Sequence, residues 1–253
     1  MVHDLQKANM GKRISAYIFD SILLITVAVG VAALLSGLFG YDTHTAERQR
    51  LRQDYETRYG ISFDVEWDSY EALPEEERQK QEEAYAAFAA DPEVGRLDAM
   101  IVNLTLLILV FSLLVPYVLL ELLVPLKLGN GQTLGKKIFG IGVMRVDGVR
   151  LSPFQLVVRT VIGKYTVETM LPLFLILMFM FNVMAFACLL GMTVLVATQG
   201  IFTLFSYRHT PIHDMIAGTV AVDFASQRIF DSTEDLLAYQ KRLAAEAAER
   251  ADY

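Results

Sequence analysis

Four apolar runs in the 253-residue sequence are each long enough to cross a lipid bilayer. They occupy residues 21–39, 100–124, 151–180 and 184–205. A spanning helix needs about 20 mostly apolar residues, and cores of soluble domains are built from shorter segments. Hydrophobic residues make up 54% of the chain, above the roughly 45–50% of a soluble domain. We therefore predict an all-α membrane protein based on a four-helix transmembrane bundle.

The first apolar run follows Lys7, Lys12 and Arg13, as the core of a secretory signal peptide would. It is longer than the roughly 7–15 residues of such a core, Asp20 stands just before it, and no clear cleavage pattern follows. We expect this run to remain as a membrane anchor.

The charge of the chain is divided unevenly. Residues 41–98 carry 16 acidic and 7 basic side chains, a net charge of -9, which leaves +2 for the rest of the chain. No basic patch is present that would bind nucleic acid. The single cysteine, Cys188, excludes an intramolecular disulfide and a cysteine metal site.

Basic residues predict the orientation in the membrane, because short loops rich in Lys and Arg stay in the cytoplasm. The N-terminal segment and residues 126–152 are both basic, which places them inside and residues 41–98 outside. Both termini are then cytoplasmic. Residues 153–170 leave two alternatives open, since they either begin the third span or lie in the plane of the membrane surface.

The segments differ in the structure that their patterns predict. Helical patterns within the acidic loop cover residues 45–59 and 75–90, and β-branched runs at 141–146 and 218–224 are expected to pair. The predicted organisation is an N-terminus and first transmembrane helix (1–40), an acidic extracytoplasmic helical loop (41–98), a second transmembrane helix (99–125), a cytoplasmic loop with a short strand (126–152), the third and fourth transmembrane helices (153–207), a His-Asp segment and strand (208–224) and a cytoplasmic amphipathic tail helix (225–253).

Eight ionisable residues lie in or beside the apolar runs. An unpaired charge in hydrocarbon costs about 2.5 kcal/mol or more, so such residues pair, face a wet cavity or carry function. The pairs considered are Arg159 with Asp20, Arg13 with Asp214, and Lys164 with Glu168. The candidate cluster comprises Arg13, Asp20, Glu121, Arg159, Lys164, Glu168, His213 and Asp214.

Three segments together resemble the RDD family of bacterial membrane proteins: residues 11–20, residues 131–148 and residues 213–219. The arginine and two aspartates of the family name correspond to Arg13, Asp20 and Asp214. The resemblance implies a bacterial inner (cytoplasmic) membrane location and a transport role, cation/proton exchange among the suggestions. It covers neither the acidic loop nor the tail.

The functional hypothesis is that Asp20, Asp214 and Glu121 line a cytoplasm-facing cavity where a carboxylate alternately binds a proton and a monovalent cation, with His213 as a proton relay. An ionic latch that fixes helix order is weighed equally. Breaks in the spans near Pro116, Pro172 or Gly200 would support transport. Expected partners are the lipid bilayer, a monovalent cation and a proton, and the short spans favour a homo-oligomer.

Other chemistries fit the sequence less well. The glycine-rich loop at 129–137 departs from a phosphate-binding loop in its spacing, and His209 and His213 are separated by Pro211. No positioned nucleophile is evident, so we expect no enzymatic activity, no metal and no cofactor. The rival hypothesis is a non-transporting scaffold that recruits a protein partner through residues 41–98 or 225–253.

Overall fold

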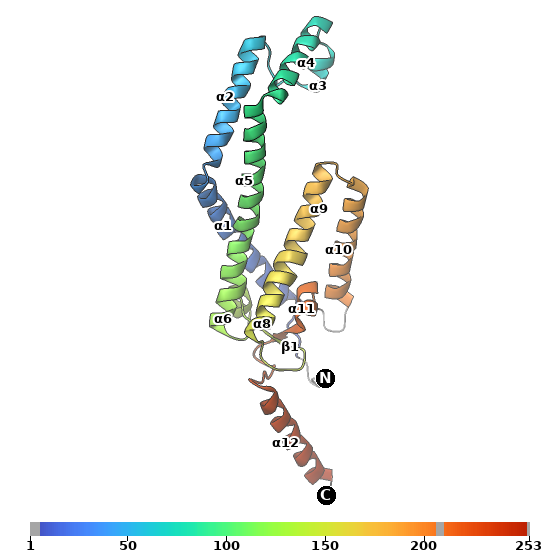
Figure 1. The fold of residues 1–253 in the computed structure, drawn as a ribbon. Helices are drawn as coiled ribbons and strands as arrows, with labels where there is room; N and C mark the ends of the chain where they lie inside the picture. The colour runs from blue at the N-terminus through green and yellow to red at the C-terminus, as the bar shows by residue number, and fades with distance from the viewer. Residues whose placement is uncertain (1–5, 206–209, 252–253) are drawn as a thin grey trace. The chain divides into compact units, whose positions relative to one another are not determined.

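The computed structural model describes residues 6–205 and 210–251, and four of its helices are long and apolar enough to cross a membrane (Figure 1). They cover Met10–Leu38, Pro92–Leu128, Pro153–Met180 and Ala185–Phe205. The four-helix prediction is therefore confirmed. Residues 153–180 form one continuous helix, so the segment at 153–170 is joined to the third apolar run without a bend into a separate surface helix.

These helices present their apolar side chains outward. In the most apolar 18-residue window of each, only 6–17% of the residues are buried within the protein. A soluble protein keeps such side chains in its core, whereas a membrane protein exposes them to acyl chains. The helices therefore contact the lipid bilayer.

The chain divides into two compact units: residues 1–28 together with 113–253, and residues 29–112. The second unit contains α2 (Tyr41–Tyr59), α3 (Trp67–Glu71) and α4 (Glu75–Ala90), together with parts of α1 (Met10–Leu38) and α5 (Pro92–Pro116). The helices predicted at 45–59 and 75–90 correspond to α2 and α4, and α3 was not predicted.

A small aromatic core holds the second unit together. Tyr55, Phe88 and Val94 are buried against one another, and the rings of Tyr55 and Phe88 meet edge to face at 5.5 Å between centroids. The Tyr55 hydroxyl donates to Asp91 at 2.8 Å, and Arg48 forms an ion pair with Asp98. The many acidic side chains of this unit remain at its surface, where water solvates them.

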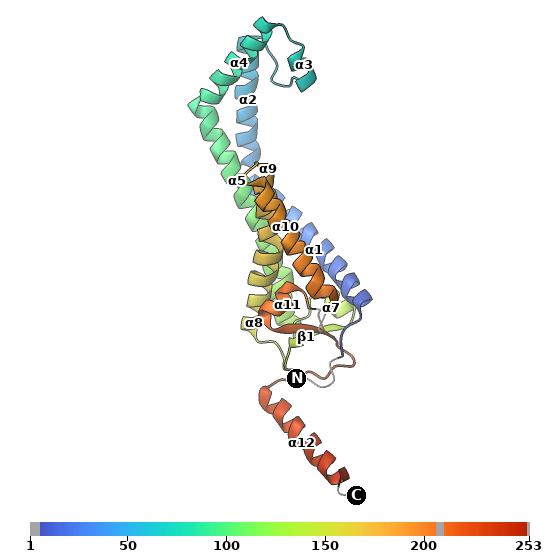
Figure 2. The ribbon, with the colours of Figure 1, turned by 90° about the vertical axis from the view of Figure 1, so that its right-hand side faces the viewer.

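In the first unit, the third and fourth apolar runs form an antiparallel helical hairpin. Helix α9 (Leu171–Met180) and helix α10 (Ala185–Phe205) lie side by side in Figure 1, and α10 lies in front of α9 in Figure 2. The connection places Asn182 and Met184 in the left-handed region, at φ 55° and 48°. The tight turn therefore lies between the third and fourth apolar runs.

Two spans are wound as π-helix over part of their length. The segments are η1 (Tyr117–Leu123), which joins α5 to α6 (Val124–Leu128), and η2 (Val158–Met170), which joins α8 (Pro153–Val157) to α9. In η2 the Thr169 hydroxyl donates to the carbonyl of Lys164, five residues back, whereas in α1 the Thr26 hydroxyl reaches only four residues back. Hydrogen bonds from i to i+5 define the π-helix and occur often at functional sites.

The three positions where a break would support transport lie within continuous spans. Pro116 ends α5 where η1 begins, Pro172 lies in the first turn of α9 directly after η2, and Gly200 lies inside α10. Proline removes one i to i-4 hydrogen bond, and a change of helical winding accommodates this loss without breaking the helix. The spans therefore remain continuous at all three positions.

A two-stranded antiparallel sheet closes one end of the first unit. Strand β1 (Ile141–Arg145) pairs with β2 (Thr219–Asp223), with Ile141 opposite Asp223 and Arg145 opposite Thr219. The predicted strand pairing is confirmed. Helices α7 (Leu134–Ile138) and α11 (Ile212–Ala217) adjoin the sheet in sequence, and the tail forms α12 (Thr233–Ala251), whose Ser232 hydroxyl accepts from the Asp235 amide at 3.1 Å.

Candidate functional site

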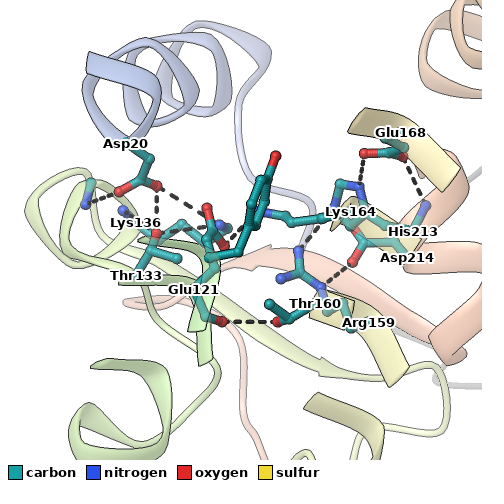
Figure 3. A network of polar contacts seen from close by, with 12 residues as sticks. Asp20, Glu121, Thr133, Lys136, Arg159, Thr160, Lys164, Glu168, His213 and Asp214 are labelled. Carbon is teal, nitrogen blue, oxygen red and sulfur yellow. Dashed lines mark hydrogen bonds and ion pairs between the residues drawn. The ribbon is translucent and has the colours of Figure 1, made fainter. Parts of the chain in front are cut away.

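A set of polar contacts involves five elements of the first unit (Figure 3). We call it the charge network. Its residues come from α1, η1, the α7 turn, η2 and α11: Asp20, Glu121, Lys136, Arg159, Lys164, Glu168, His213 and Asp214. Seven of the eight residues predicted for the cluster are in it, and Lys136 is an addition.

Asp20 binds the start of α7. Its carboxylate accepts from the Thr133 hydroxyl at 2.5 Å and from the Gly135 amide at 2.8 Å, and the Lys136 ammonium lies 3.9 Å away. The unpaired amides of a helix N-terminus favour a carboxylate. The predicted Arg159–Asp20 pair is therefore wrong, because the partner of Asp20 comes from the glycine-rich loop.

Glu121 pairs with Lys164 across two spans. The Lys164 ammonium lies 2.5 Å from Glu121, and both side chains are largely buried. The hydroxyl of Thr160 donates to the backbone carbonyl of Glu121 at 2.9 Å, which adds a second link between η1 and η2. Glu121 occupies η1, where a neighbouring helix rather than lipid satisfies its charge.

The predicted pair of Lys164 with Glu168 is wrong as well. These residues are four apart, a spacing that brings side chains together on an α-helix. Lys164 binds Glu121 of η1 and Glu168 binds His213 of α11, so each residue has its partner in another element.

Arg159 and Asp214 form the most deeply buried ion pair. The guanidinium Nε donates to Asp214 at 2.7 Å, and the two side chains are 1% and 2% exposed. The Thr219 hydroxyl donates to the same carboxylate at 2.6 Å. Arg159 is therefore the partner of Asp214 in place of Arg13. Arg13 lies close enough to Asp214 for an electrostatic interaction but forms no ion pair with it.

Glu168 and His213 form the remaining pair. The ring Nδ1 of His213 lies 2.7 Å from one carboxylate oxygen, and the His213 backbone amide donates to the other at 2.9 Å. Gln199 in α10 donates to Glu168 at 3.1 Å and accepts from the amide of Ile212. The Nε2 of His213 meets the guanidinium of Arg159 at 3.1 Å, which joins this pair to Asp214.

Two glycines permit the close approach that these contacts require. A Cβ on Gly163 of η2 would lie 2.7 Å from the Cβ of His213, and a Cβ on Gly135 would lie 2.5 Å from the carbonyl oxygen of Ala16. Real Cβ atoms do not come this close to other heavy atoms. Both positions therefore require glycine on steric grounds alone.

Burial and neighbouring charges shift the pKa values of the network residues outside the spans. Burial lowers the pKa of His213; Asp214 opposes this effect and Arg159 adds to it. Burial opposes ionisation of Asp214, yet Arg159 and then His213 outweigh it and hold the pKa of that carboxyl well below its usual range. Burial and the charge of Lys164 lower the pKa of Lys136 to about 8.

A cavity of about 880 Å³ adjoins the network. Apolar side chains line one part of it, among them Leu24, Leu113 and Leu195, and charged side chains line another. The charged lining includes Arg13, Asp20, Glu121, Lys136, Arg159, Lys164, Glu168, His213 and Asp214. All eight residues predicted for the cluster therefore line one space, which lies wholly within the first unit.

Sequence reasoning missed the uncharged members of the site. Each of these donates a hydrogen bond to one of the acidic residues; they are Thr133, Thr160, Gln199 and Thr219. Thr133 had a detectable signal, because a threonine that caps a helix before Gly135 and Lys136 makes an anion-binding turn. The other three lie in runs without a distinctive pattern.

The described residues contain no group of three or more His, Cys, Asp or Glu side chains placed to hold a metal ion. His209, four residues before His213, lies outside the residues that the structure describes. The charged side chains of the network are instead paired with one another and hydrogen-bonded beside the cavity.

Alanine at Gly163 should disrupt the contact between η2 and α11. We expect Gly163→Ala to cost about 1–3 kcal/mol of stability, because the new methyl group overlaps His213. The measurement is the melting temperature of detergent-purified protein. Gly30→Ala in α1 is the control, because a Cβ there meets nothing within 4 Å; equal melting temperatures for the two variants would contradict the close packing.

His213 should make stability depend on pH. Its pKa in the folded protein lies below its ordinary value of 6.5, so the unfolded chain binds the proton more readily. Stability is therefore retained above about pH 6.5 and decreases as the pH falls below it. We expect the melting temperature to fall between about pH 7.5 and pH 5.5 in the unmodified protein and to fall less in His213→Gln. His44→Gln, outside the network, is the control, and an unchanged slope in His213→Gln would contradict the assignment.

Comparison with protein families gives one match, to the RDD family, over residues 7–218. The matched region contains the four apolar helices and all eight predicted cluster residues, and it ends before β2 and α12. Comparison with curated proteins and with solved structures finds no match. The chain is a member of the RDD family of membrane proteins.

Proposed function

We propose that this protein is a transporter that exchanges a monovalent cation for a proton, with the charge network as its exchange site. The observation that supports this function is the cavity of about 880 Å³, whose wall contains buried carboxylates from η1 and α11 and partly buried ones from α1 and η2. Ionisable side chains inside membrane bundles mark ion pathways and proton relays in many proteins.

Within the network, Glu168 and His213 are suited to carry the proton. Neither partner of this pair is an arginine or a lysine, whereas the pairs of Asp214 and Glu121 contain Arg159 and Lys164. A proton on the pair offsets the charge of Glu168, and its release restores a negative carboxylate that would attract a small cation. Asp214 has a different role, because Arg159 keeps it ionised and fixed.

We further propose that the protein lies in the bacterial inner membrane with both termini in the cytoplasm. The basic residues of the segment at 126–152 favour this orientation, which places α7, α11 and the sheet on the cytoplasmic side. The cavity would then open to the cytoplasm, and apolar faces left uncovered by the chain would suit assembly of several copies. Neither catalysis nor a cofactor is part of the proposal.

Proton flux in liposomes tests the proposal. Purified protein is reconstituted with a pH-sensitive dye inside, a pH gradient is imposed, and Na⁺ or K⁺ is added outside. We expect cation-dependent proton movement, reduced about tenfold or more in Glu168→Gln, because glutamine keeps the shape of the side chain and cannot carry a proton. Glu234→Gln, on the exposed face of α12, should retain full flux.

The proposal fails if the unmodified protein, shown to be folded and inserted, moves no protons when either cation is added. It also fails if Glu168→Gln transports as well as Glu234→Gln. Size-exclusion profiles and melting temperatures of both variants separate a loss of transport from a loss of folding.

A scaffold that recruits a protein partner is the second candidate. Its specific support is that residues 29–112 form a compact unit with its own aromatic core and an acidic surface. Removing residues 41–98 distinguishes the candidates, because a transporter should keep cation-dependent flux without them. A scaffold should lose a partner captured from its native membrane while the remaining helices stay folded.

A further inference from the structure

The charged lining of the cavity has more hydrogen-bond donors than its own carboxylates use. Asp20, Glu121, Glu168 and Asp214 each accept from a side chain or amide of the protein. Among the charged residues that line the cavity, Arg13 is the one to which the described part of the chain provides neither a hydrogen bond nor an ion pair. Its electrostatic neighbours are Asp214, which Arg159 already binds, and Arg159 itself.

Arg159 adds a second unmet donor. Its Nε binds Asp214 and its Nη2 meets His213, but its Nη1 is buried without a hydrogen-bond partner among the described residues. In Figure 3 this third nitrogen points away from Asp214 and His213, toward the middle of the network. Buried polar groups are almost always satisfied, and a charged one without an acceptor is a notable exception.

Both unmet groups are guanidinium donors, which prefer an acceptor with two oxygens. Carboxylate and phosphate groups match the fork of a guanidinium and form bidentate hydrogen bonds with it. A cation at the same place would meet Arg13 and Arg159 without a carboxylate that is free of a donor. The chemistry of this part of the cavity therefore favours an anion.

The rest of the cavity favours an apolar tail on that anion. Leu24, Ile25, Leu113, Leu195 and Val196 line the same space as the two arginines. The volume of about 880 Å³ lies within the range of sites that hold drug-sized or lipid-like ligands. A small inorganic anion would leave this apolar surface uncovered.

We propose that the cavity binds an amphiphilic oxyanion, whose carboxylate or phosphate group is held by Arg13 and by Nη1 of Arg159 while its apolar chain lies along the leucine-lined wall. The inference goes beyond cation/proton exchange and does not depend on it. Two sources can supply this chemistry: an anionic phospholipid of the surrounding bilayer, or a free oxyanion that enters from water.

Binding in detergent tests the site without any gradient. The intact protein in a non-ionic detergent is titrated with short-chain phosphatidylglycerol, with phosphatidylcholine of the same chain length and with inorganic phosphate, and binding is followed by native mass spectrometry. We expect phosphatidylglycerol to bind, phosphatidylcholine to bind about tenfold more weakly or less, and Arg13→Gln to weaken phosphatidylglycerol binding about tenfold to a hundredfold.

Lys12→Gln is the matched control. Lys12 precedes Arg13 and carries the same charge, but it pairs with Asp223 at 2.7 Å and does not line the cavity. This variant should bind phosphatidylglycerol within about twofold of the unmodified protein. Arg13→Lys keeps the charge with a different donor geometry and should bind more tightly than Arg13→Gln.

The outcomes separate the two sources and also decide the inference. Arg13-dependent binding of phosphatidylglycerol alone supports the site and assigns a lipid. Arg13-dependent binding of both phosphatidylglycerol and the weaker inorganic phosphate supports the site and shows that it also admits a free oxyanion, whereas inorganic phosphate that binds more tightly than phosphatidylglycerol overturns the amphiphilic ligand. Equal binding by Arg13→Gln and Lys12→Gln overturns it, as does equal binding of the two phospholipids by the unmodified protein. If Arg13→Gln does not fold, Arg13→Lys and the comparison of phospholipids still decide the question.

Discussion

The ion pair between Arg159 and Asp214 is the contact on which the first unit depends. Both side chains are almost wholly buried, and together they connect the third span to the short helix that precedes β2. Removing a buried charge from water costs several kcal/mol per ion, which only a close partner and further hydrogen bonds repay. His213 and Thr219 supply those bonds, so each element of this region positions another.

The same side chains serve structure and line the cavity, so a latch and an exchange site are compatible. Asp20 fixes α7 to α1, Glu121 and Lys164 join the second and third spans, and Glu168 joins η2 to α10 and α11. The pairs differ in how readily a proton changes them. Arg159 holds the pKa of Asp214 well below its usual range, whereas burial lowers the pKa of His213 beside Glu168.

The sequence predicted what depends on local patterns. Apolar runs located the four helices, and β-branched runs located β1 and β2. It did not predict which charges pair, because Lys164 and Glu168 of η2 have their partners in η1 and α11, which are distant in the sequence. The partner of Asp20 was missed because a turn far along the chain, at Thr133 and Gly135, supplies it. Membership of the cluster was predictable because charges in apolar runs are rare, but its connections depend on tertiary packing.

A double-mutant cycle on Arg159 and Asp214 tests the central role of this pair most directly. The unfolding free energies of Arg159→Gln, Asp214→Asn and the double variant are measured in detergent against the unmodified protein. We predict that each single variant loses about 3–5 kcal/mol, because it leaves the other charge buried and unpaired, and that the double variant loses clearly less than the sum. Losses that simply add would show that the two residues act independently and would contradict this account.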